Sequence, residues 1–235
     1  EKLLYLEDLG VTVLYLNPIF VSASNHRYDT GDYKNIDAYL GTKEDLELLC
    51  QEAAEHGIRI ILDGVFSHTG DDSIYFNKYG RYASLGAYQS KESPYYSWYR
   101  FEQYPDKYAS WWGVGTLPEV EETTPSYMDF IFRSQDSVLK TWLHAGISGW
   151  RLDVADELPP LFLKSFWQEL KHCQKDAILI GEVWEDASNK ISYGQQRAYL
   201  CGGQLDSAMN YVLRNIMLDF VRGSADGDLT NRRIL

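Results

Sequence analysis

Apolar runs and helix-like periodicities alternate along the chain and predict repeated strand–helix units. Apolar runs predict buried strands at 11–17 and 58–65, and further strands at 147–154, 177–183 and 205–209. Apolar residues at helical spacing predict helices at 42–56, 135–145 and 161–172, and another helix that ends near residue 221. Thr42 and Asp45 form a capping box at the start of the first helix, and Gly57 ends it. Such units indicate an α/β fold with a parallel sheet, either a barrel or a doubly wound sheet.

The segment from Thr69 to Arg133 interrupts this alternation. It shows little periodicity, but it holds 10 of the 18 tyrosines and 3 of the 7 tryptophans. Two interpretations remain open, and they are compatible: a small subdomain with an aromatic core, or a wall of aromatic platforms for sugars. We therefore expect three parts, namely a first barrel part at 1–68, an aromatic-rich excursion domain at 69–133, and a second barrel part at 134–235.

Composition narrows the class of protein. The chain has 235 residues, of which 45% are hydrophobic, so it can bury a substantial core and is neither disordered nor a small disulfide scaffold. With 22 basic and 34 acidic residues the net charge is −12, which argues against nucleic acid and anionic membrane surfaces as partners. Three cysteines without metal-ligand spacing, and no signal-like segment, predict free thiols in the cytoplasm.

Ionisable residues stand at the carboxyl ends of three successive predicted strands. Asp63 ends the first of these strands, Arg151 and Asp153 lie in the second, and Glu182 ends the third. Ligands of parallel α/β folds bind at these ends, and in a barrel several strands contribute together, so the three positions favour a barrel. Each position also has a purely structural explanation. Asp63 could accept backbone hydrogen bonds, and His68 could be a structural histidine with its hydrogen bonds made beside Asp63. Arg151 and Asp153 could form a structural ion pair, and Glu182 could be a solvated group at the end of a strand.

The two carboxyl groups suggest a reaction. Arg151 is expected to keep Asp153 ionised, because a nearby cation favours the charged form. Val183 and Trp184 give Glu182 apolar surroundings, which are expected to raise its pKa and retain its proton. A pair of carboxyls with opposite shifts is typical of the nucleophile and the acid of a glycosidase. A phosphate-handling enzyme is disfavoured, since no glycine-rich phosphate loop follows any strand.

Several motifs together resemble a known family. DGVFSH (63–68), GWRLDVADE (149–157) and GEVW (181–184) resemble the first three conserved regions of the α-amylase family, glycoside hydrolase family 13. HRYDTGDY (26–33) and LPEVE (117–121) are similar to two further segments of that family, and the whole is most like its neopullulanase, cyclomaltodextrinase and maltogenic amylase group. The resemblance implies an incomplete (β/α)8 TIM-type barrel, about strands 2–6 of eight, with an irregular excursion domain after the third strand.

The resemblance also implies residue roles. Asp153 is the implied nucleophile, Glu182 the implied general acid/base, and Arg151 the residue that orients and ionises Asp153. Five further positions are implied to bind the substrate or shape its site: Tyr28, His68, Asp63, Trp184 and Glu157. The implied reaction is retaining hydrolysis or transglycosylation of α-1,4 and, as an option, α-1,6 bonds in maltooligosaccharides, cyclodextrins, pullulan or starch.

Three departures from the family pattern qualify this hypothesis. The His–Asp pair of the fourth conserved region, with its third catalytic carboxylate, is absent, so the chain is expected to be an internal fragment. An alternative function is therefore a fragment that binds α-glucan without turning it over. Ser67 replaces an asparagine that helps bind calcium in many relatives, so we expect no metal and no cofactor. ADE (155–157) replaces the ANE that is common in this group, which leaves the preference for acceptor sugars open. The formation of a homodimer is also left open.

Overall fold

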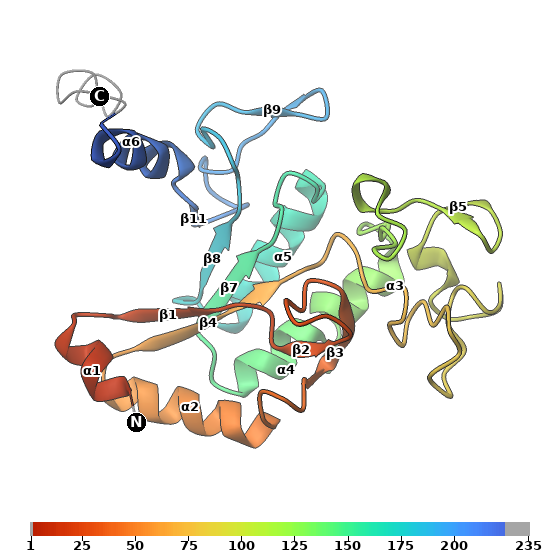
Figure 1. The fold of residues 1–235 in the computed structure, drawn as a ribbon, viewed down its shortest axis with the longest axis horizontal. Coiled ribbons are helices and arrows are strands. Elements are labelled where there is room, and N and C mark those ends of the chain that lie inside the picture. Colours follow the sequence, from red (N-terminus) through yellow and green to blue (C-terminus); the bar gives the residue numbers. More distant parts are fainter. Residues whose placement is uncertain (1, 224–235) are drawn as a thin grey trace.

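A five-stranded parallel sheet forms the centre of the fold. The structure is a computed structural model that describes residues 2–223; the remaining positions of the predicted parts 1–68 and 134–235 lie outside the described residues. The strands lie in the order β1 (Val13–Leu16), β4 (Arg59–Gly64), β7 (Gly149–Leu152), β8 (Ile178–Gly181) and β11 (Ser207–Ala208) (Figure 1). The five strands lie side by side in the order in which they follow along the chain, without the reversal of order that a doubly wound sheet has.

Helices connect these strands, largely as the periodicity predicts. The connecting helices are α2 (Lys43–Glu55), α4 (Val138–His144) and α5 (Pro160–Cys173), while α1 (Leu3–Asp8) precedes β1 and α6 (Tyr211–Val221) follows β11. The capping box of Thr42 and Asp45 is confirmed, and Gly57 follows α2 with a φ of +67°, a conformation that favours glycine. Figure 1 shows α2 and α4 beneath the strands. Over residues 2–223, no helix combines the length and apolarity that crossing a membrane requires.

Aromatic rings fill the space between sheet and helices. Phe66 lies just after β4. The centroid of its ring is 5.7 Å from that of Trp150 in β7 and 5.6 Å from that of Phe166 in α5. All three side chains are buried. Because Phe66 lies between Asp63 and His68 in the chain, its packing anchors the segment that carries both side chains.

Within residues 2–223, the first strand is more exposed than predicted. Val13 is 42% exposed and Tyr15 37% exposed, whereas every residue of β7 is buried. The physical reason is position: among the described strands β1 is at an edge of the sheet and pairs only with β4. Apolar runs alone do not distinguish edge strands from central ones.

A β-hairpin that the periodicity does not reveal follows β1. It consists of β2 (Phe20–Ser22) and β3 (Thr30–Ile36), and the connection between them carries Tyr28. The Tyr33 hydroxyl donates to the Val65 carbonyl at 2.5 Å, and the Trp142 indole of α4 donates to the Tyr33 carbonyl at 2.9 Å. These bonds fix the hairpin against β4 and α4.

The excursion segment, residues 69–133, contains only short elements. They are η1 (Tyr96–Trp98), β5 (Phe101–Gln103), β6 (Lys107–Tyr108), η2 (Trp111–Gly113), α3 (Pro125–Met128) and the π-helix η3 (Asp129–Arg133). Many of its aromatic side chains are buried together, among them Tyr75, Phe76, Trp98, Tyr99 and Tyr127. Trp112 in contrast is 64% exposed. The aromatic residues thus build an interior, while Trp112 remains at the surface.

Candidate active site

Four ionisable side chains from three adjacent strands meet in one buried cluster. Asp63 of β4 lies opposite Arg151 of β7 in the strand register, and Asp153 and Glu182 directly follow β7 and β8. All four are buried, and Asp63 is the least accessible. The carboxyl ends of parallel strands meet at one edge of the sheet, which is why positions far apart in the sequence converge here.

Arg151 lies at the centre of this cluster. Its Nη1 donates to Asp63 Oδ1 at 2.8 Å and to Asp153 Oδ1 at 2.8 Å, and its Nη2 lies 2.7 Å from Glu182 Oε1. One guanidinium therefore serves three carboxylates. Since one positive charge cannot compensate three negative ones, the fully ionised cluster would be a buried site with excess negative charge.

The pKa shifts are opposite to the directions predicted from the sequence, and that prediction is wrong. Burial, together with the charges of Asp63 and Glu182, raises the pKa of Asp153 to about 7, because Arg151 is shared. Burial also acts to raise the pKa of Glu182, but hydrogen bonds and Arg151 lower it overall. Its Oε2 accepts from the Val154 N–H at 2.9 Å, so its surroundings are more polar than the neighbouring sequence suggests.

These shifts predict a limit on activity at alkaline pH. A pKa of about 7 means that the two carboxyls together hold one proton below pH 7 and lose it above. We expect kcat/KM for maltotriose to fall about tenfold per unit above this pH, because the reaction needs that proton. Asp63→Asn removes a negative neighbour and should move the midpoint to lower pH. An unchanged midpoint in the pH profile of this variant would contradict the assignment.

Tyrosines complete the surroundings of Asp63. The Tyr15 hydroxyl donates to Asp63 Oδ2, and Tyr28 is close enough to feel the charge of this carboxylate. Within residues 2–223, the side chain of Asp63 thus accepts from Tyr15 and Arg151, whereas the sequence had suggested backbone donors. Burial and the charge of Asp63 raise the pKa of Tyr28 to about 12, so its hydroxyl stays neutral and its half-buried ring borders the cluster.

His68 already has partners for both ring nitrogens. Its Nε2 lies 3.1 Å from the Tyr28 carbonyl, which can only accept, so Nε2 carries the hydrogen. Its Nδ1 then accepts from the Ser67 hydroxyl at 2.9 Å. Burial lowers the pKa of His68 to about 4, so the ring is neutral at physiological pH. Both ring nitrogens of His68 therefore have hydrogen-bond partners. These partners are the Tyr28 carbonyl and the Ser67 hydroxyl, and not Asp63 as the structural alternative had suggested.

Ser67 does not fit the calcium-binding position of the resemblance. Its hydroxyl is buried and is directed to His68, and a hydroxyl is a weaker calcium ligand than the amide oxygen of asparagine.

A cavity of about 380 Å³ lies on the Glu182 side of the cluster. Its wall contains both residues predicted for the acceptor side, Trp184 and Glu157, together with Val154. Two other lining residues, Trp112 and Tyr193, were not predicted from the sequence. Trp112 lies within the aromatic-rich segment 69–133, which was a signal for it, whereas no pattern pointed to Tyr193. Tyr211, at the start of α6, was also missed; its hydroxyl donates to Glu182 Oε1 at 3.2 Å.

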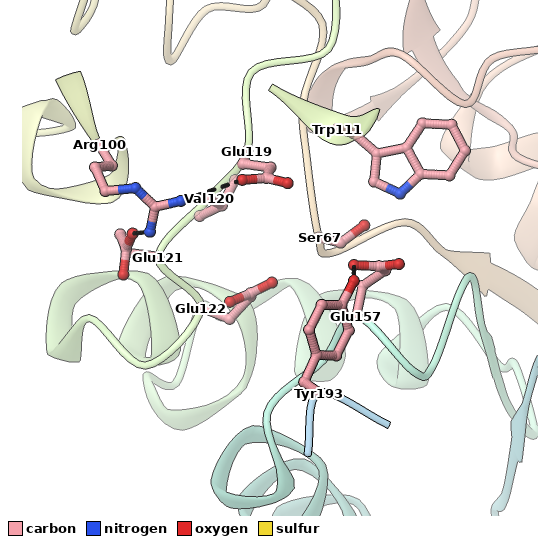
Figure 2. A pocket seen from close by; sticks show the side chains of 9 residues that line it. All are labelled: Ser67, Arg100, Trp111, Glu119, Val120, Glu121, Glu122, Glu157 and Tyr193. Atoms are coloured by element: carbon pink, nitrogen blue, oxygen red, sulfur yellow. Dashed lines mark hydrogen bonds and ion pairs between the residues drawn. The ribbon is translucent and has the colours of Figure 1, made fainter. Parts of the chain in front are cut away.

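A second cavity, of about 300 Å³, is strongly acidic (Figure 2). Arg100 pairs there with Glu121 at 2.7 Å and with Glu119 at 3.5 Å. Burial raises the pKa of Glu122 to about 8, so this carboxyl keeps a proton at neutral pH. Figure 2 shows these groups across from Tyr193 and Glu157, which belong to the walls of both cavities.

Known proteins with similar sequences and structures identify the family of this chain. A family model described as the α-amylase catalytic domain matches residues 1–231. An amylopullulanase of Thermoanaerobacterium thermosulfurigenes is 43% identical over 97% of this chain, which spans 13% of that protein. Neopullulanase 2 of Thermoactinomyces vulgaris is 35% identical over 100% of this chain, which spans 39% of that protein. Proteins named cyclomaltodextrinase and maltogenic α-amylase match as well.

Among solved structures, the cyclic α-maltosyl-(1→6)-maltose hydrolase of Arthrobacter globiformis in complex with that sugar has a TM-score of 0.84 and 30% identity. The match covers 99% of this chain and 50% of the hydrolase. The chain therefore spans half or less of the proteins it most resembles here. The family match over nearly the whole chain, the motifs and the strand-end cluster lead to one conclusion: this chain belongs to the α-amylase family and is part of its catalytic domain.

Proposed function

We propose that the protein containing this chain is a retaining α-glucan hydrolase or transglycosylase. The observation that carries the proposal is the buried Arg151 cluster, with Asp153 and Glu182 at the ends of adjacent parallel strands. Asp153 Oδ attacks the anomeric carbon while Glu182 donates its proton to the departing glycosidic oxygen, which gives a β-linked glycosyl-enzyme. Water or a second sugar then attacks, Glu182 takes its proton, and the α configuration returns.

The reactive form is the cluster with a single proton, carried by Glu182. In the site without substrate that proton is favoured on Asp153, because Arg151 lies 2.7 Å from Glu182 and favours its ionised form. A glycosidic oxygen bound at Glu182 accepts a hydrogen bond only from the protonated acid, and so substrate draws the proton there. Arg151 then compensates the charge of Asp153, which it contacts at 2.8 Å.

The five parallel strands are proposed to be strands 2–6 of a (β/α)8 barrel. Their monotonic order and the helices between successive strands from β1 to β8 support this arrangement. The rest of the protein would then supply the remaining strands and the third carboxylate of the family. Relatives named for pullulan and maltodextrin substrates support α-1,4- and α-1,6-linked glucans as the substrate class.

The leaving group tests the role of Glu182. In the full-length protein, we expect Glu182→Gln to slow cleavage of maltotriose about 10²- to 10⁴-fold, because its sugar leaving group needs a proton. Cleavage of p-nitrophenyl α-maltoside to p-nitrophenol should slow far less in a single-turnover measurement, since that leaving group departs as an anion. The matched control is Glu52→Gln, at an exposed position of α2.

Equal losses on both substrates would contradict the proposed acid. Proton NMR of the first product should show the α anomer, and a β product would contradict retention. If the full-length protein binds maltooligosaccharides without releasing reducing sugar, the binding function is supported instead.

A further inference from the structure

Three exposed aromatic rings border the cavity beside Glu182. Trp112 is 64% exposed, Trp184 43% and Tyr193 71%, and all three line the same cavity. Glu182 belongs to its wall but Asp153 does not. If Glu182 is the acid, as proposed above, the sugar that leaves or accepts lies on this side. We propose that Tyr193, acting through Glu157 and Trp112, positions the acceptor-side sugar of the reaction.

The backbone at Tyr193 is unusual. Tyr193 and Gly194 form the two-residue turn of a hairpin between β9 (Ile191–Ser192) and β10 (Gln195–Gln196), in which Ser192 pairs with Gln195. Their φ angles are +51° and +72°. Such turns favour glycine, asparagine or aspartate at both positions, and a tyrosine there is strained. Strain of this kind persists where other contacts hold the residue, and the Tyr193 side chain has such a contact.

Glu157 receives hydrogen bonds from two separate loops. The Tyr193 hydroxyl donates to its Oε2, and the Trp112 indole donates to its Oε1 at 3.2 Å. Trp112 also has a left-handed backbone, with a φ of +49°. Two strained aromatic residues, one after β8 and one in the excursion segment, are therefore directed to one carboxylate. Both bonds end on the same side chain, so the two loops are held to one carboxyl group.

The same contacts extend to the proposed acid. The Trp112 ring lies edge-on to Trp184, with 5.7 Å between the ring centroids and an interplanar angle of 78°. Trp184 in turn follows Glu182 by two residues in the chain, and both line this cavity. The hydroxyl of Tyr193 thus restrains, through Glu157 and Trp112, an aromatic wall that it shares with the proposed acid.

The chemistry of this wall suits a glucosyl unit. Indole and phenol rings pack against the C–H face of a sugar, and a carboxylate accepts from its hydroxyls. Figure 2 shows the Tyr193 hydroxyl meeting Glu157, and these two residues separate the cavity beside Glu182 from the acidic one. The hydrogen-bonded pair of Tyr193 and Glu157 therefore forms part of the cavity wall, and it acts only in steps where a sugar occupies the cavity.

Tyr193→Phe in the full-length protein tests this role, because the variant keeps the ring and removes only the hydroxyl. With maltose as acceptor, we expect the ratio of transglycosylation to hydrolysis to fall about fivefold, the effect of losing about 1 kcal/mol of hydrogen bonding. Attack of water on the glycosyl-enzyme should change less than twofold. The matched control is Tyr39→Phe, whose hydroxyl has no partner among residues 2–223. In a Glu157→Ala background, Tyr193→Phe should have no further effect.

The outcomes separate this inference from the proposed function. An unchanged ratio in Tyr193→Phe overturns the inference, and so does an equal loss in both reactions together with a lowered Tm, which a purely structural role would give. If the wild-type protein turns over no α-glucan, the proposed function fails, and calorimetric titration with maltotriose then decides. Weaker binding by Tyr193→Phe than by Tyr39→Phe keeps the sugar site, and equal or absent binding overturns it.

Discussion

Asp153→Asn in the full-length protein is expected to lower kcat for α-glucans by about 10⁴- to 10⁶-fold. Asparagine has the shape of aspartate and still accepts a hydrogen bond from Arg151 Nη1, 2.8 Å away in the wild type. It cannot form the glycosyl-enzyme, because its amide oxygen is a poor nucleophile. The measurement is the release of reducing sugar from γ-cyclodextrin and maltotriose, and turnover near the wild-type rate would disprove the nucleophile.

The stability of the same variant shows whether the loss reflects chemistry or unfolding. Burial and neighbouring charge raise the pKa of Asp153 to about 7, so at pH 8 its ionised form is unfavourable in the folded state. Removing that charge should leave Tm unchanged or raise it at pH 8. Asp176→Asn, at an exposed position before β8, is the control and should alter neither activity nor Tm.

Arg151→Leu is expected to destabilise the protein by about 3–5 kcal/mol at pH 8, the usual cost of removing one partner of a buried ion pair. Without the guanidinium, Asp63, Asp153 and Glu182 would lie close together with no cation, because Arg151 contacts all three. Denaturant unfolding of the full-length protein measures the effect. Arg59→Leu, at the exposed start of β4, is the control and should cost much less.

The sign of the pH dependence follows from the same contacts. Without Arg151, the folded-state pKa values of Asp63 and Asp153 rise further above their unfolded values, and the pKa of Glu182 loses the lowering effect of the guanidinium. Such groups favour the folded state at low pH and lose that contribution as pH rises through the folded-state values. The deficit of Arg151→Leu should therefore shrink between pH 8 and pH 5, and adding Asp63→Asn should recover part of it. A deficit that is independent of pH and of Asp63 would point to lost packing instead of lost charge compensation.

Local sequence determined most of the regular elements. The capping box at Thr42 and the stop at Gly57 delimit α2 because they satisfy backbone groups within the helix itself. The β2–β3 hairpin escaped prediction because its register is irregular and its buried Tyr33 is held by Val65 and Trp142, residues distant in the chain. The exposure of β1 escaped it because an apolar run does not reveal how many neighbours a strand has.

For the site, the sequence by itself placed Asp63, Asp153 and Glu182 at strand ends, and a parallel sheet brings such ends together. The tertiary structure alone decided how their protons are distributed, because that depends on one Arg151 being shared by three carboxylates. It also determined the two hydrogen bonds that Glu157 accepts, because their donors, Trp112 and Tyr193, lie 45 and 36 residues away along the chain. Local patterns describe a residue's neighbours in sequence, whereas charge compensation and hydrogen bonding depend on its neighbours in space.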